Sequence, residues 1–247
     1  MVDLINGIGA EPVDLVANSM GGFFAVAYAL THPDRVRGLV LVGAAAGLHR
    51  EVPLFLRLWA NPVTGPLIAR TKITDAEALR RIYARLLVVH PERVPLDLLQ
   101  TAAAAVAIPG ADRAASSMLR SFVTLRGVKP KLLLRDEMAG LRVPTLFLWG
   151  DSDAFAPAIR GQEVAAKMAD ARFDVLAHSG HLPQIDHPEA VASAINEFLG
   201  GSGVPWSVDA PAGRSAPEVL AVDPGEAVTA RAGRGRSRTE RSRVNAR

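Results

Sequence analysis

Four short apolar runs that contain Val or Leu stand out along the chain, and they hold few polar residues. They extend from Val13 to Ala17, Val36 to Val42, Thr145 to Trp149 and Arg172 to Ala177. Strands of a parallel sheet show this pattern because helices cover both of their faces. Helical patterns follow these runs, for example Met20 to Thr31 after the first run and Pro188 to Leu199 after the last. This alternation predicts βαβ units and an α/β fold with a parallel sheet.

The long segment at residues 48–142, between the second and third runs, is predicted to be a helical, lid-like cap inserted into the core. Thr74-Asp75-Ala76-Glu77 has the form of a capping box, which satisfies free backbone N–H groups where a helix begins. Two apolar helical faces lie in the segment, one made of Leu79, Ile82, Tyr83, Leu86 and Leu87 and the other of Ala114, Ala115, Met118, Leu119, Phe122 and Val123. The alternative is a plain helical pack that has no contact with a functional site.

Residues 201–247 are predicted to form a disordered, Arg-rich tail, because Gly, Pro, Ser and Ala leave too few apolar residues to offset the entropy of ordering. The tail holds eight Arg and five acidic residues, so its charge of 8 − 5 = +3 equals that of the whole chain. The other residues hold 28 − 8 = 20 basic and 25 − 5 = 20 acidic side chains. The globular part therefore gives no sign of specific nucleic-acid binding. Tail arginines could bind phosphates, although a solvated tail is the simpler explanation.

Composition excludes sites that need cysteine, and the absence of a secretory signal or an apolar span indicates where in the cell the protein is expected. The chain has no Cys, which excludes disulfides, thiolate zinc sites and a cysteine nucleophile. Its first residues lack the basic region and uninterrupted apolar stretch of a secretory signal. No run reaches the roughly 18 apolar residues of a membrane span without a charge or a Pro. We therefore expect a cytoplasmic protein without a membrane span.

A candidate nucleophile, Ser19, lies between the first predicted strand and the helix that follows it. A sharp strand-to-helix turn strains the backbone of such a serine, so the positions two before and two after it must be small. Ala17 and Gly21 meet this requirement. The turn would place the hydroxyl at a helix N-terminus, where free N–H groups favour developing negative charge.

A serine hydroxyl needs a base to take its proton, and the base needs an acid to orient it. The strand from Thr145 to Trp149 is followed by Asp153, and the next strand is followed by His181. With Ser19, all three candidates follow parallel strands at their C-terminal ends, where such sheets place their sites. The order Ser, Asp, His along the chain is that of the α/β-hydrolase fold.

Residues 1–200 resemble the C-terminal two-thirds of an α/β-hydrolase. The resemblance is carried by Asn18-Ser19-Met20-Gly21-Gly22, by Trp149-Gly150-Asp151-Ser152-Asp153 and by Gly180-His181-Leu182-Pro183. It implies a core at residues 1–47 and 143–200 and a Ser19–His181–Asp153 catalytic triad. It also implies an oxyanion donor at the backbone N–H of Met20 and no metal or organic cofactor. Asp151, a turn residue under this assignment, is the alternative acid, and His178 is the alternative base.

The sequence around Ser19 resembles that of two branches of the superfamily, the capped serine esterases and the meta-cleavage C–C bond hydrolases. The second branch usually has Trp after the base and an Arg-Trp pair in the cap, whereas this chain has Leu182 and no such pair. The resemblance therefore predicts a serine hydrolase of a small or medium acyl ester. The alternatives are a C–C bond hydrolase, with Arg120 or Arg126 facing the substrate carboxylate, and a catalytically impaired truncated hydrolase.

The start of the chain departs from the resemblance. Members of the family build four strands before the serine turn, but here only 12 residues precede the first predicted strand. A second oxyanion donor normally comes from a His-Gly-type loop in that region, and the chain has no such motif. We expect the strand from Val13 to Ala17 to have a free apolar edge, which favours self-association or aggregation.

Overall fold

The computed structural model describes Asp3, Ile5 and Gly7 and residues 12–69, 75–200 and 219–221. Its main sheet has the strand order β1-β2-β5-β6-β7. The strands β1, β2, β5 and β6 of this sheet are parallel, and β7 is antiparallel to β6. Their bounds are Val13–Asn18 (β1), Val36–Val42 (β2), Thr145–Gly150 (β5), Ala171–Leu176 (β6) and Val219–Ala221 (β7). The four predicted strands are therefore confirmed.

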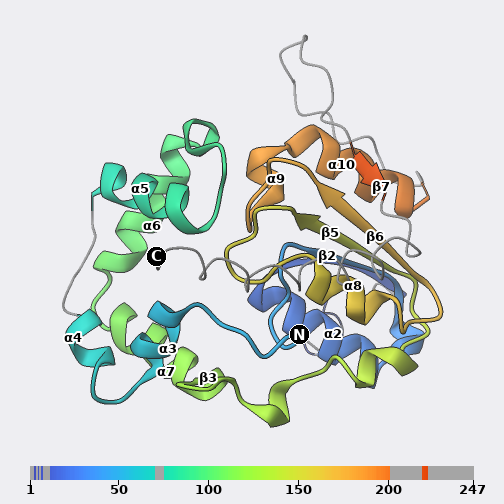
Figure 1. The fold of residues 1–247 in the computed structure, drawn as a ribbon, viewed down its shortest axis with the longest axis horizontal. Coiled ribbons are helices and arrows are strands. Elements are labelled where there is room, and N and C mark those ends of the chain that lie inside the picture. Colours follow the sequence, from blue (N-terminus) through green and yellow to red (C-terminus); the bar gives the residue numbers. More distant parts are fainter. Residues whose placement is uncertain are drawn as a thin grey trace, which may run out of the picture.

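Helices cover both faces of the sheet, which explains why its strands lack polar alternation (Figure 1). Alternate side chains of β2 and β5 face opposite layers. Leu39 and Phe147 pack with helices α2 and α8, and Val40 and Leu146 pack with α10 on the other side. The helices outside the cap are α2 (Met20–Thr31), α8 (Ile159–Ala165), α9 (Pro183–Asp186) and α10 (Pro188–Phe198), with short 3₁₀ turns at Pro33–Arg35 (η1), Pro130–Leu132 (η3) and Glu137–Gly140 (η4).

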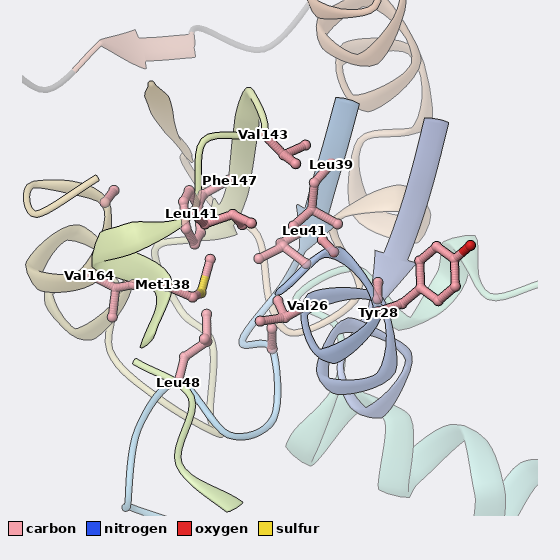
Figure 2. Packing of buried hydrophobic residues seen from close by; sticks show 14 of the residues in the cluster. Val26, Tyr28, Leu39, Leu41, Leu48, Met138, Leu141, Val143, Phe147 and Val164 are labelled. Atoms are coloured by element: carbon pink, nitrogen blue, oxygen red, sulfur yellow. The ribbon is translucent and has the colours of Figure 1, made fainter. Parts of the chain in front are cut away.

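The larger of the two core layers is buried between the sheet, α2 and α8. Figure 2 shows Val26 of α2, Leu41 of β2 and Met138 of η4 meeting in this layer. All three side chains are fully buried. The layer fixes α2 against the sheet, and with it the turn that bears Ser19.

We call residues 54–128 the cap; five described helices and a small hairpin fill this part of the predicted insertion (Figure 1). They are α3 (Leu54–Ala60), α4 (Gly65–Ala69), α5 (Ala76–Leu86), α6 (Leu96–Ala107) and α7 (Ala111–Phe122), with the 3₁₀ turn η2 (Pro91–Arg93) and the hairpin strands β3 (Val123–Thr124) and β4 (Gly127–Val128). One apolar cluster packs α3 and α7 of the cap against the start of α2. Another packs α5 and α6 against Leu182 and Ile185. No described helix is long and apolar enough to cross a membrane.

Three sequence expectations differ from the structure in detail. The N-cap of α5 is Asp75, whose carboxylate accepts a hydrogen bond from the Ala78 N–H (2.8 Å), so the helix begins one residue later than the predicted capping box implies. Met118 is 47% exposed, because α7 buries only the Leu119 and Phe122 edge of its predicted face. The strand β7 lies within the predicted tail and pairs with β6, because a short Val-Leu-Ala run can extend a sheet edge. The rest of residues 201–247 lies outside the described residues.

Candidate active site

Ser19 occupies a strained turn between β1 and α2. Its backbone angles are φ 52° and ψ −116°, and His178 is the other described non-glycine residue with a positive φ. A non-glycine residue holds such angles only where its surroundings enforce them. Here the Ser19 carbonyl oxygen accepts hydrogen bonds from the Gly22 and Ala46 N–H groups, both at 3.0 Å. The half-buried serine therefore sits at the head of α2, as the sequence predicts.

The need for small residues around this turn is strongest at Gly22. A Cβ atom added there would lie 2.7 Å from the Cβ of Ala45, closer than real Cβ contacts allow. At Gly21 an added Cβ would lie 3.8 Å from the Cβ of Ala17, which is ordinary van der Waals contact. The helix is therefore held close to the sheet by Gly22, and Ala17 and Gly21 leave room for little more than a methyl group.

Asp153 and His181 form a buried pair. The Nδ1 atom of His181 lies 2.9 Å from Oδ2 of Asp153. His181 is 2% exposed and Asp153 is 7% exposed. The carboxylate also accepts hydrogen bonds from the N–H groups of Ala44 (2.9 Å) and Phe155 (2.8 Å). The Phe155 ring stacks on the imidazole with a centroid distance of 4.0 Å. Since an ionised carboxylate can only accept, Nδ1 carries the proton and Nε2 is left with a free lone pair.

The serine turn and this pair are joined through Asn18 and Gly43. The Asn18 side-chain amide donates to the carbonyl oxygens of Val42 (2.7 Å) and His181 (3.2 Å). Gly43 has a φ of 68°, and a Cβ added to it would lie 2.4 Å from the His181 carbonyl oxygen. Asn18, the residue before Ser19, thus contacts the backbone of His181. The His181 Nε2 atom is buried and has no hydrogen-bond partner among the described residues, the Ser19 hydroxyl included.

The alternative acid and base occupy different environments. Asp151 accepts hydrogen bonds from the N–H groups of His178 (3.0 Å) and Ser179 (3.1 Å) and from the Ser152 hydroxyl (2.9 Å). Burial acts to raise the pKa of Asp151, but these donors outweigh it and the pKa is lowered. The side chain of His178 is exposed. These are the contacts of a turn, and neither Asp151 nor His178 takes part in the carboxylate–imidazole pair that Asp153 and His181 form.

Two further groups complete the predicted set. Met20 begins α2 directly after Ser19, so its N–H belongs to the first helical turn, where backbone donors have no acceptor within the helix. Arg120 and Arg126, the cap residues considered for a substrate carboxylate, both have exposed side chains. No group of three or more potential metal ligands occurs within the described ranges.

His49 is a site neighbour that sequence patterns did not reveal. It is 6% exposed, its Nδ1 atom lies 2.9 Å from the Glu51 carbonyl oxygen, and its Nε2 atom is buried without a described partner. Burial lowers the pKa of His49, the carboxylate of Asp153 opposes that shift, and the imidazole of His181 adds to it. It lies on the loop after β2 whose Ala44 N–H binds Asp153. A lone histidine among Gly and Ala carries no periodic signal from which its burial could be foreseen.

Comparisons with known proteins identify the family of the chain. A family model described as the alpha/beta hydrolase fold matches residues 1–188. The chain is 29% identical over 202 residues to a 2-hydroxy-6-oxononadienedioate/2-hydroxy-6-oxononatrienedioate hydrolase of Paraburkholderia phymatum, covering 80% of this chain and 65% of the relative. It is 27% identical over 212 residues to a 2-hydroxy-6-oxo-6-phenylhexa-2,4-dienoate hydrolase of Burkholderia cepacia, covering 79% and 65%. The chain thus spans about 65% of the length of these relatives.

Solved structures give the same fold. A meta-cleavage product hydrolase from Pseudomonas fluorescens has a TM-score of 0.64 at 21% identity, over 82% of this chain and 70% of that one. A thermophilic esterase from Thermogutta terrifontis has a TM-score of 0.57 at 27% identity, over 79% and 68%. Together with the family match over most of the chain, they establish that this protein belongs to the α/β-hydrolase fold family.

Proposed function

We propose that this chain carries the catalytic residues of a serine hydrolase that cleaves a C–C bond in a 2-hydroxy-6-oxo-dienoate. The observation that carries the proposal is the buried Asp153–His181 pair, which leaves Nε2 unpaired in a residue whose backbone is hydrogen-bonded to Asn18, next to the strained turn of Ser19. The substrate class is supported by relatives that are named hydrolases of such dienoates and are 27–29% identical. This reverses the preference of the sequence analysis, in which ester hydrolysis ranked first.

The three side chains have separate roles in this proposal. Nε2 of His181 takes the proton of the Ser19 hydroxyl as its oxygen attacks a carbonyl carbon. Asp153 keeps the proton on Nδ1 and stabilises the imidazolium that forms. The N–H of Met20, in the first turn of α2, stabilises the resulting oxyanion.

Cleavage of a C–C bond differs from ester cleavage in its leaving group. An alkoxide leaves readily, whereas a carbon group must be stabilised by delocalisation and protonated as it departs. The leaving carbon of a conjugated 2-hydroxydienoate can delocalise that charge only after the substrate has tautomerised to its 2-oxo form, with the proton of the 2-hydroxyl moved to that carbon. The carbon then leaves as a dienolate, and the imidazolium of His181 returns to this dienolate the proton taken from Ser19. Water then attacks the acyl-serine with the same base, which releases the acid product and restores the hydroxyl.

Ester hydrolysis is the second candidate. It is favoured by the likeness to the thermophilic esterase, at 27% identity, and by the exposed side chains of Arg120 and Arg126, which bear no mark of a built carboxylate site. The same triad serves both reactions, so the substrate decides between them.

Parallel assays with two substrates test the proposal. The purified chain is given 2-hydroxy-6-oxo-6-phenylhexa-2,4-dienoate, followed by loss of the dienoate absorbance, and p-nitrophenyl butyrate, followed by nitrophenolate release. We expect a kcat/KM for the dienoate at least tenfold above that for the ester, with both activities lost in Ser19→Ala. A preference for the ester would select the second candidate, and turnover that survives in Ser19→Ala would reject the triad.

A further inference from the structure

Asp186 is a fully buried carboxylate outside the proposed triad. It ends α9, five residues after His181, and its side chain is 0% exposed. No described Lys or Arg side chain forms an ion pair with it. Its oxygens instead accept hydrogen bonds from three backbone N–H groups, those of Val89 (3.0 and 3.1 Å), His90 (2.8 Å) and Gly180 (2.8 Å). A carboxylate is buried at a high cost unless such donors replace water, so these contacts define its position.

The three donors come from two parts of the chain that are far apart in sequence. Val89 and His90 follow helix α5 of the cap, and Gly180 directly precedes His181. The Asp186 carboxylate therefore joins the cap to the loop that bears the proposed base. We call this set of contacts, from Asp186 to the N–H groups of Val89, His90 and Gly180, the Asp186 clamp.

Other contacts tighten the same junction. The N–H of Leu182 donates to the carbonyl oxygen of Leu87 (2.9 Å), and a Cβ added to Gly180 would lie 2.6 Å from that same oxygen. The Arg93 guanidinium donates to the backbone carbonyl oxygen of Asp186. Leu182 and Ile185 pack into an apolar cluster whose buried members are Leu79, Val88, Val94 and Leu99 of the cap. The Asp186 carboxylate is therefore kept away from water, which strengthens the hydrogen bonds that it accepts.

These contacts bracket His181 on both sides. The peptide before it is held through Gly180 and the Asp186 clamp, and the peptide after it is held through Leu182 and Leu87. The restraint on Leu182 comes directly from Leu87 of the cap. The restraint on Gly180 reaches the cap through the Asp186 carboxylate, which Val89 and His90 also bind. A base that is misplaced by about 1 Å can lose about 10²-fold in rate, so the position of this cap segment bears directly on catalysis.

We infer that Asp186 is a positioning residue through which the docked cap sets the orientation of the His181 imidazole. The inference rests on the proposed function, since it assigns His181 the role of base. It makes residues 87–90 of the cap a working part of the catalytic centre, in addition to any contact that the cap makes with substrate. Displacement of this segment would move the base and lower turnover.

Asp151, which directly follows β5, provides a matched control because its carboxylate binds the same loop. Its carboxylate also accepts two backbone N–H groups, from His178 and Ser179, but none of its described donors comes from the cap. Asp186→Asn and Asp151→Asn each replace one carboxylate by an amide of similar size. Amide hydrogen exchange is then measured on peptides that contain residues 87–90 and 178–182. Exchange reports the clamp whether or not the chain is active.

In Asp186→Asn we expect both peptides to exchange faster, and in Asp151→Asn only the one with residues 178–182. Steady-state kinetics on the better substrate should show kcat lowered about 10²-fold in Asp186→Asn with KM changed less than about threefold. Faster exchange in only one segment, or an unchanged kcat, would overturn the inference. If the wild-type chain turns over neither substrate, the proposed function fails, and the exchange pattern alone then judges the clamp.

Arg93→Met serves if Asp186→Asn does not fold, as judged by circular dichroism. It removes one contact between the cap and the Asp186 backbone but leaves the buried carboxylate and its donors in place. The same two peptides should exchange faster, by a smaller factor, and kcat should fall by severalfold with KM little changed. Wild-type exchange and kcat in Arg93→Met would overturn the inference in that case.

Discussion

The two halves of the proposed triad are held in place by different means. Asp153 and His181 are buried and hydrogen-bonded to each other, and they are contacted from two loops, at Ala44 and Phe155, and from the end of β1, at Asn18. Ser19 is only half-buried, and the backbone of its strained turn positions it together with one tertiary hydrogen bond, from the Ala46 N–H to its carbonyl oxygen. The acid and base are therefore a product of tertiary packing, and the serine is mainly a product of local strain.

The strands that carry these halves differ in the same way. Every residue of β5, which leads to Asp153, is buried. Most residues of β1, which leads to Ser19, are half-buried, and Val16 is 51% exposed, because β1 has only β2 as a described neighbour in the sheet. The serine half of the site thus stands on the more weakly supported strand.

The largest expected effect is on the serine half. Ser19→Ala should lower turnover by about 10⁶-fold, because it removes the nucleophile and leaves only binding and oxyanion stabilisation. A fluorophosphonate probe should label the wild-type protein at Ser19 alone, as judged by mass spectrometry of tryptic peptides. Undiminished labelling of Ser19→Ala would show that another residue is the nucleophile.

The base should show an effect of similar size. His181→Ala should lower kcat by several orders of magnitude, since the serine then lacks a proton acceptor. His178→Ala is the control on the same loop, with an exposed side chain, and should lose less than about tenfold. The opposite ranking of these two variants in a stopped or continuous assay would place the base at His178.

A smaller loss is expected for the acid. Asp153→Asn should lower kcat by about 10⁴-fold, because an amide no longer holds the proton on Nδ1 of His181. Asp151→Asn should cost far less, since Asp151 contacts the backbone of the loop and not the imidazole. Equal losses in the two variants would mean that both aspartates act through the loop.

The exposed edge of β1 leads to a prediction about association. We expect the wild-type chain to elute from gel filtration as species larger than a monomer, with a share that rises with concentration. Val16→Lys places a charge on that edge and should shift the protein toward the monomer. Phe24→Lys adds the same charge at a residue of α2 that is 52% exposed and should leave the elution unchanged. A wild-type chain that is monomeric at all concentrations would refute the prediction.

The smallest expected effect concerns His49 on the acid–base side. Burial lowers the pKa of His49 in the folded state, so below about pH 6.5 the unfolded chain binds a proton that the folded chain does not. Stability from this group is therefore complete at neutral pH and falls as the pH falls, by at most about 1.4 kcal/mol per pH unit. His49→Gln should lose less stability between pH 7.5 and 5.5 than the wild type in urea titrations. His178→Gln is the control, and an unchanged pH dependence in His49→Gln would contradict the assignment.

Much of the fold follows from patterns that are local in sequence. The strands β2 and β5 and the helix α2 lie where runs of Val, Leu and Ala predict them. Helices bury both faces of these strands, and the strands therefore hold few polar residues. The turn at Ser19 is equally local, since it needs only small neighbours and a helix behind it. Such features depend on residues a few positions apart, and one sequence suffices to find them.

Contacts between distant residues depended on the tertiary structure. Only the folded loops show that the Asp153 carboxylate accepts a hydrogen bond from the His181 imidazole and another from the Ala44 N–H, 109 positions away. They also show that Asp151 binds the backbone of the turn at His178. Likewise, Val89 of the cap donates a hydrogen bond to Asp186, 97 positions further along the chain. No periodicity in the sequence predicts that this buried carboxylate joins the cap to the loop of His181. The sequence alone determined the elements and the order of the chemical groups. How loops close in space decided which of those groups touch, because hydrogen bonds require a fit of a few tenths of an ångström that many packed residues produce together.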